Sequence, residues 1–244
     1  MRIKSFKNFI SESEEETYSF SELSPEAKKN ALDNNRDINV DYEGWSDPVI
    51  EGFKEDMEEI GIGDLEVYYT GFYSQGDGAS FTTDYIDSTL FLNKMAEHDT
   101  EGLKKSQYSK TPWYLSKIDL EKKGAGDYED LIGDLTDIGI KTKGKVNPEN
   151  IKISVVSNDS RYSHENTVEA EVELEDTDDL EWSYQEVLEF ESDLASHITS
   201  YIRNFCKQLY RSLSKDYDML TSDESVQETI EANDYRFDEE GNLA

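Results

Sequence analysis

Two short polar motifs carry the residues of this 244-residue sequence that are best suited to binding or acid–base chemistry. The first, SQGDG, covers residues 74–78, and the second, RYSH, covers residues 161–164. A glycine-rich turn exposes backbone N–H groups that can hold an anion, and a histidine can exchange protons near neutral pH. If both motifs line one pocket, they provide four candidate ligand-binding residues: Gln75, Asp77, Arg161 and His164.

Neither motif has the composition of a catalytic centre. SQGDG lacks the lysine and hydroxyl residues of a phosphate-binding P-loop, and no nucleophile stands beside His164. The other histidines, His98 and His197, are isolated, and no calcium-binding loop of the Asp-x-Asp-x-Asp-Gly type occurs. We therefore predict no catalytic residue, no metal and no cofactor, and we expect that the protein is not an enzyme. Structural turn chemistry is the simpler interpretation of SQGDG.

Carboxylates dominate the composition. The chain has 56 acidic and 24 basic side chains, a formal charge of −32, while 11% of its residues are aromatic, which indicates a folded chain rather than an acidic tail. Such a charge repels nucleic acids and anionic membranes, so we expect neither as a direct partner. It favours instead a partner protein with a basic surface. The alternative is that the charge serves solubility alone.

The segment 167–181 presents these carboxylates at a regular spacing. Alternate residues of a predicted strand are acidic, so they share its solvent face at intervals of about 6.6–7 Å. This interval is close to the repeat of phosphates along a nucleic-acid strand, which permits DNA mimicry. Tyr68, Tyr69 and Tyr73 are candidate anchors for the same partner. The predicted partner-binding face consists of Glu169, Glu171, Glu173, Glu175, Asp176, Asp178 and Asp179.

Hydrophobic periodicity predicts an α+β fold that would position these residues. Two hairpins are expected, over 65–85 and 151–174, and the first turns at the glycines of SQGDG. The longest helix is expected over 184–217, where one apolar stripe continues for about nine turns. An antiparallel sheet with helices packed on one face and a long C-terminal helix follows from this order. Shorter helices are expected over 25–34, 47–60, 127–138 and 221–233.

Charge suggests the domain organisation. Residues 1–16 are predicted to be a leader and linker, and residues 17–244 a single α+β domain with a lysine-bearing insertion around 88–150. Ten lysines and eight acids lie between Lys104 and Lys152, in contrast to the acidic remainder. Cys206 lies in the apolar stripe and is predicted to be a small buried hydrophobe. No stretch of eighteen apolar residues occurs, so no membrane span is expected.

The first twelve residues form a short basic amphipathic segment. Its apolar side chains, Ile3, Phe6, Phe9 and Ile10, have helical spacing and alternate with basic residues. The segment resembles the capsid-targeting leaders of internal proteins in large tailed phages, which a prohead protease cuts after an Ile/Leu-x-Glu sequence. Ile10-Ser11-Glu12 matches that site, so the resemblance implies processing after Glu12. An ordinary N-terminal helix is the alternative.

Three longer stretches are similar to a family of acidic phage and prophage proteins, some of which are labelled antitoxins of a toxin–antitoxin stability system. They are the helix start at 20–28, the segment 69–81 with its SQGDGASF sequence, and the closing segment 217–242. RYSH also fits this resemblance. The resemblance implies a phage context, with the host cytoplasm or the virion as the location.

Three functions remain open. The first is a phage-encoded acidic protein that inhibits a host defence or toxin protein, such as a nuclease or restriction enzyme with a basic groove. The second is an internal or capsid-associated virion protein that is delivered with the genome. The third is a small-molecule-binding protein or enzyme that uses the SQGDG turn and the RYSH loop. An oligomer is compatible with the long apolar stripe.

Overall fold

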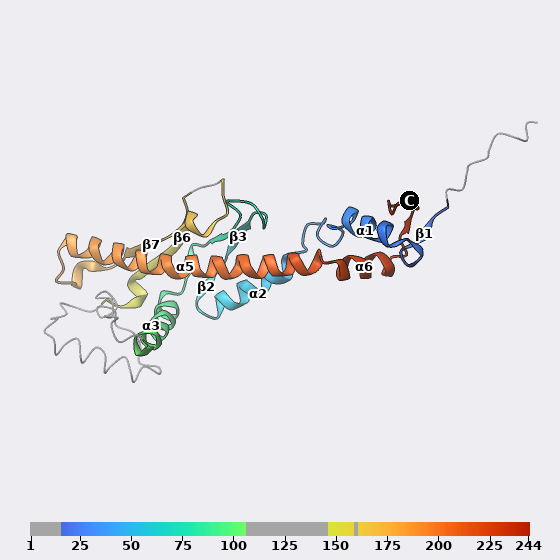
Figure 1. The fold of residues 1–244 in the computed structure, drawn as a ribbon. Coiled ribbons are helices and arrows are strands. Elements are labelled where there is room, and N and C mark those ends of the chain that lie inside the picture. Colours follow the sequence, from blue (N-terminus) through green and yellow to red (C-terminus); the bar gives the residue numbers. More distant parts are fainter. Residues whose placement is uncertain (1–15, 106–145, 159–160) are drawn as a thin grey trace, which may run out of the picture. The chain divides into compact units, whose positions relative to one another are not determined.

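The computed structural model describes residues 16–105, 146–158 and 161–244, except for the side chains of 97–105 and Asp179. It confirms the predicted α+β class, with small antiparallel sheets and a long C-terminal helix (Figure 1). The predicted helix over 127–138 lies outside the described residues, as does Glu12. The helices are α1 (Pro25–Asn34), α2 (Asp47–Glu58), α3 (Ser88–Lys105), α5 (Tyr184–Leu220) and α6 (Asp223–Ala232). The strands are β1 (Tyr18–Ser19), β2 (Ile62–Gly63), β3 (Glu66–Tyr69), β4 (Ala79–Thr82), β5 (Tyr85–Ile86), β6 (Ile151–Ser157), β7 (Val168–Leu174) and β8 (Arg236–Phe237).

The described chain forms two compact units. The first, the terminal unit, combines the residues up to Ser46 with those from Lys215 to Ala244, and the second, the central unit, runs from Asp47 to Ser214. The central unit contains both predicted hairpins and most of α5. That residues 17–244 make one domain stays a prediction.

Two hairpins form the sheet structure of the central unit. β3 pairs with β4 so that Val67 faces Phe81, and β6 pairs with β7 so that Ile153 faces Val172. A bridge joins the hairpins, because Thr83 and Val155 each donate a backbone N–H to the other's carbonyl, at 3.1 and 2.8 Å. Phe81 is fully buried on this sheet and packs against Phe53 of α2, with the ring centres 5.7 Å apart.

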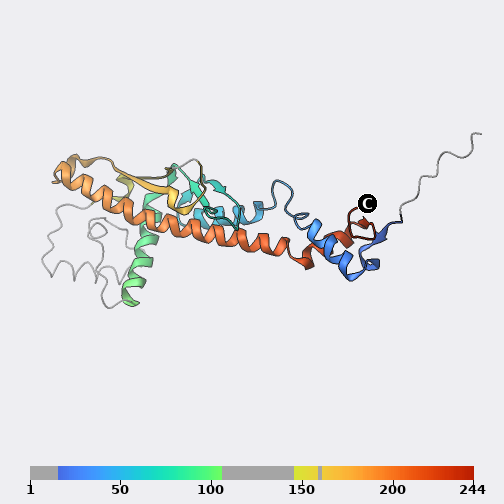
Figure 2. The same cartoon turned by 45° about the horizontal axis from the view of Figure 1, so that its top comes forward.

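Helix α5 covers the β6–β7 hairpin with the apolar stripe that the sequence predicts, and the hairpin lies along the helix in both views (Figures 1 and 2). A capping box begins the helix: the Ser183 hydroxyl accepts from the Glu186 N–H at 3.3 Å, and the Glu186 carboxylate accepts from the Ser183 N–H at 2.8 Å. The buried apolar side chains of this helix are Phe190, Leu194, Ile198, Ile202, Cys206, Leu209 and Leu213.

The terminal unit joins residues that are far apart in the sequence. β1 pairs with β8, so that Tyr18 faces Phe237. Helix α1 begins where the sequence predicts, with the Ser24 hydroxyl accepting the Ala27 N–H at 3.1 Å and Pro25 in the first turn. The unit has its own buried core, made by Phe20, Leu23, Ala27, Ala31, Val226, Ile230 and Phe237.

A tight loop over residues 238–242 docks against α1. The Asp238 carboxylate accepts hydrogen bonds from the side-chain amide and the backbone N–H of Asn242, which lower the pKa of Asp238. Asn30 of α1 donates to the Glu240 carbonyl at 3.1 Å. Gly241 has a φ of +90° and lies so close to α1 that an added Cβ would be 2.1 Å from the Ala27 carbonyl oxygen. The loop therefore needs glycine at 241.

Candidate functional site

The SQGDG turn and the RYSH loop lie against each other in the central unit. Gly78 is buried at their junction, where an added Cβ would be 2.8 Å from the Ser163 carbonyl oxygen and 2.9 Å from the Cα of His164. The ring of Tyr162 lies next to Gly76, 3.6 Å from the position of an added Cβ. The two motifs that the sequence singles out are therefore neighbours, and their backbones are in close contact.

Within SQGDG, hydrogen bonds close the turn on itself. The Asp77 carboxylate accepts the Ser74 N–H at 2.6 Å, and the Asp77 N–H donates to the Ser74 carbonyl at 3.1 Å. The Gly78 N–H donates to the Thr70 hydroxyl at 3.1 Å. Gln75 is exposed at the tip. The Asp77 carboxylate thus holds the turn together, which is the structural role that the sequence also allowed.

His164 caps the short 3₁₀ turn η4 (Glu165–Thr167) that leads into β7. Its Nδ1 accepts the Asn166 N–H at 3.2 Å and lies 2.9 Å from a Glu165 carboxylate oxygen. These contacts need opposite states of Nδ1, a lone pair for Asn166 and a proton for Glu165. The Thr167 hydroxyl donates to the His164 carbonyl at 2.8 Å, and Arg161 is exposed at the start of the loop. Through its Nδ1 atom, His164 therefore supports the local backbone at the start of η4.

Aromatic side chains beside this junction form a stack. Phe72 lies between Tyr69 and Tyr210 of α5, with ring centres 6.1 and 5.8 Å apart, and the Tyr210 hydroxyl donates to the Phe72 carbonyl. Partial burial, with the charges of Asp77 and Glu165, raises the pKa of Tyr210. Of the predicted tyrosine anchors, Tyr69 packs in this stack, while Tyr68 and Tyr73 are exposed.

Two surface hollows lie elsewhere in the central unit. One is lined by β4, β5 and β6, together with Asp64 and Glu66. The other, of about 500 Å³, lies between β7 and α5. Neither is lined by Gln75, Asp77, Arg161 or His164. The meeting of the two motifs is therefore a packed junction with an exposed surface, and the pocket that a small-molecule function requires of them is not among these hollows.

Strand β7 presents its carboxylates as the alternation predicts. Glu169, Glu171 and Glu173 are exposed, whereas Val168, Ala170 and Leu174 are buried. A basic side chain accompanies each end of this row: Arg203 of α5 lies 3.8 Å from Glu169, and Lys152 is the cross-strand neighbour of Glu173. The rest of the predicted acidic face follows the strand, where Glu175, Asp176 and Asp178 are exposed and Asp179 belongs to the 3₁₀ turn η5 (Thr177–Asp179).

The outer edge of β7 is hydrogen-bonded by side chains of α5. The Arg203 guanidinium donates to the Val168 carbonyl at 3.2 Å, and the Thr199 hydroxyl accepts the Ala170 N–H at 2.9 Å. The Glu191 carboxylate accepts the Leu174 N–H at 2.8 Å. β7 is thus protected from pairing with another strand over most of its length.

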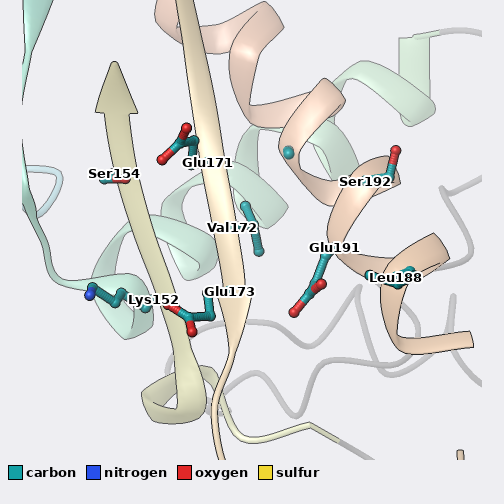
Figure 3. Close-up of a pocket in the computed structure, with 9 residues that line it drawn as sticks. Lys152, Ser154, Glu171, Val172, Glu173, Leu188, Glu191 and Ser192 are labelled. Carbon is teal, nitrogen blue, oxygen red and sulfur yellow. The ribbon is translucent and has the colours of Figure 1, made fainter. Parts of the chain in front are cut away.

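A groove interrupts this protected edge at Val172 (Figure 3). Val172, Leu188 and Ala195 provide its apolar walls. Glu191 of α5 extends into the space between the two elements, and Glu171 and Glu173 line the groove on the side of β7. Lys152, Ser154 and Ser192 complete the lining. The sequence points to the two strand glutamates only, because β6, β7 and α5 come together through tertiary packing. For the helix, the sequence offers one signal: residues spaced four positions apart share a face of α5, and these are Glu191, Ala195, Thr199 and Arg203.

Cys206 is fully buried in α5, as its place in the apolar stripe predicts. Burial raises the pKa of its thiol to about 12. At pH 8 roughly one thiol in ten thousand is then ionised, so we expect almost no reaction of the folded protein with a coloured disulfide reagent. Reaction should become complete in denaturant. Fast labelling of the folded chain would contradict this burial.

Two general features bear on function. Among the side chains that the structure describes, no group of three or more from His, Cys, Asp or Glu could hold a metal ion. The helices within residues 16–105, 146–158 and 161–244 include none long and apolar enough to cross a membrane. Processing after Glu12 stays a prediction.

Comparison with known proteins gives a family for the central unit. The profile of a family described as a domain of unknown function, DUF8835, matches residues 45–223, which include all of the central unit. No curated protein and no solved structure matches the chain.

Proposed function

We propose that this chain, which belongs to the DUF8835 family, is an acidic binding protein whose partner is a protein with a basic surface. The observation that carries the proposal is the groove between β7 and α5, around which Glu171, Glu173 and Glu191 place carboxylates from two elements. Carboxylates beside an apolar wall suit the long, partly apolar side chains of lysine and arginine. In the phage context that the sequence resemblance implies, the partner would be a host defence or toxin protein.

DNA mimicry is the finer form of this proposal, and the geometry favours it less. A mimic needs an unbroken row of like charges, whereas Arg203 and Lys152 stand beside Glu169 and Glu173 at the two ends of the β7 row. These cations reduce the local field of the row. We therefore propose recognition of basic side chains at the groove rather than replacement of a DNA strand.

The test is the binding of a hexa-arginine peptide to the full chain, measured by calorimetry. The double variant Glu171→Gln/Glu173→Gln should bind about three- to tenfold more weakly at low ionic strength, because two exposed charge pairs are lost. The difference should shrink at about 0.15 M salt, where such charges are screened. Binding that is tight and independent of salt would contradict an electrostatic function.

A matched control separates this face from overall charge. Glu51 and Glu55 are exposed on α2, four residues apart, and their replacement by glutamine removes the same two charges. We expect the control variant to bind hexa-arginine with less than about a twofold change. Equal weakening by both double variants would show that the peptide senses net charge alone, which overturns the assignment to β7 and α5.

A further inference from the structure

Side chains along one face of α5 pair in order with the outward peptide groups of β7. Glu191, Thr199 and Arg203 hydrogen-bond Leu174, Ala170 and Val168, so the helix position rises as the strand position falls. Four residues of helix advance by about 6 Å, and two residues of strand by about 6.6 Å, so each four-residue step of α5 matches a two-residue step of β7.

This register places Ala195 opposite Val172. The position lies four residues after Glu191 and four before Thr199, and both Ala195 and Val172 line the groove. Because the N–H groups of Ala170 and Leu174 point towards α5, the peptide groups of Val172 point the same way. An alanine methyl cannot hydrogen-bond them. In the described part of the chain, no side chain hydrogen-bonds the outward peptide groups of Val172.

The hydrogen bonds between α5 and the edge of β7 are thus interrupted at a single residue, Val172. This short gap restricts what can occupy it. A partner strand would need a run of open N–H and carbonyl groups, and the neighbouring N–H groups, those of Ala170 and Leu174, are already bonded to α5. A single side chain fits this geometry instead. It would meet the outward Val172 carbonyl, an apolar wall that includes Leu188, and the acidic residues that line the groove.

We propose that the groove at Val172 and Ala195 receives one arginine side chain of the partner protein, with its stem on Val172 and Leu188 and its guanidinium between Glu171, Glu173 and Glu191. The inference rests on the proposed function and names the group that is recognised. Guanidinium has five N–H donors in a plane and therefore bonds a carbonyl and carboxylates together, whereas an ammonium acts as a point charge. Its planar shape selects arginine over lysine.

The probe is a glycine-flanked peptide with one arginine, compared with the same peptide carrying lysine or the neutral isostere citrulline. Amide chemical shifts of the full chain report binding residue by residue. We expect the arginine peptide to shift the signals of Val172, Ser192 and Ala195, and the lysine peptide to bind at least about threefold more weakly. The citrulline peptide should produce no shift at these positions.

The variant Ala195→Gln tests the gap itself. Glutamine fills the groove and supplies the missing polar partner for Val172, and it leaves the charge of the protein unchanged. We expect at least about a fivefold loss of affinity for the arginine peptide, with the salt dependence of hexa-arginine binding retained. Ser212→Gln, at an exposed position of the same helix, is the control that should bind as the unmodified chain does.

The outcomes distinguish the groove from the general function. If hexa-arginine binds in a salt-dependent way but Ala195→Gln has no effect on the single-arginine peptide, the groove assignment is overturned and the proposed function stands. If neither peptide binds at low salt, both fail. Equal binding of the lysine peptide overturns the choice of arginine. A concentration-dependent dimer that Ala195→Gln dissociates would make a second copy the occupant, contrary to the proposal.

Discussion

Gly241→Ala is expected to destabilise the terminal unit by about 3 kcal/mol or more. The added Cβ would lie 2.1 Å from the Ala27 carbonyl oxygen, and the φ of +90° is one that alanine rarely adopts. Because the clash is with backbone of α1, the loop over 238–242 must leave the helix. It would then lose the hydrogen bond from Asn30 to Glu240. Amide hydrogen exchange in β1 and β8 measures the effect without requiring the two units to unfold together.

Gly52→Ala is the matched control for this change. Gly52 lies inside α2, and an added Cβ would meet nothing within 4 Å. Alanine has the higher helix propensity, so this variant should be as stable as the unmodified chain or more stable by up to about 1 kcal/mol. If Gly241→Ala left exchange in β1 and β8 unchanged, the close approach of the loop to α1 would be refuted.

Gly78→Ala is expected to destabilise the central unit by about 2 kcal/mol and to separate the SQGDG turn from the RYSH loop. An added Cβ would lie 2.8 Å from the Ser163 carbonyl oxygen and 2.9 Å from the Cα of His164, both of which are backbone atoms. Neither atom can move without displacing the loop. The midpoint of urea unfolding measures the loss, and the amide signals of Asn166 and Thr167 report the loop.

The control for this variant lies in the same connection between β3 and β4. At Gly71 the nearest atom to an added Cβ is a carboxylate oxygen of Asp77, at 3.3 Å, and a small shift of this side chain relieves the contact while its hydrogen bond from the Ser74 N–H is kept. We therefore expect Gly71→Ala to cost less than about 1 kcal/mol. Equal losses from the two variants would mean that the turn, and not its junction with RYSH, determines the effect.

Local patterns in the sequence predicted several elements correctly, although not helix α3, which lies in the segment predicted to be an insertion. The alternation from Val168 to Leu174 gave the correct faces of β7, because a strand has a period of two whatever it packs against. Ser24 and Pro25 correctly predicted the start of α1, since capping depends on neighbouring residues only. The apolar stripe of α5 was similarly correct, with its end at Leu220 a few residues beyond the predicted one.

The groove could not be predicted in this way, because it depends on the register between two elements. Ala195 is an ordinary helix residue in the sequence, and only its place opposite Val172 gives it importance. Asp77 and His164 show the converse. Their side-chain types favoured ligand chemistry, yet the structure uses both to hold local backbone, as caps of a turn and of a 3₁₀ turn. Side-chain type alone does not separate these roles.

The pairing of Ser19 with Arg236 has a consequence for the order of events during synthesis. At about 5–20 residues per second, the ribosome needs roughly 10 to 40 s to make the chain between these two residues. For that time Phe20 and Leu23 lack the α6 and β8 residues that later bury them. The central unit can fold first, while the nascent chain carries an unfinished apolar surface at its beginning. A chaperone that binds such surfaces would therefore meet this protein on the ribosome, before its last strand is made.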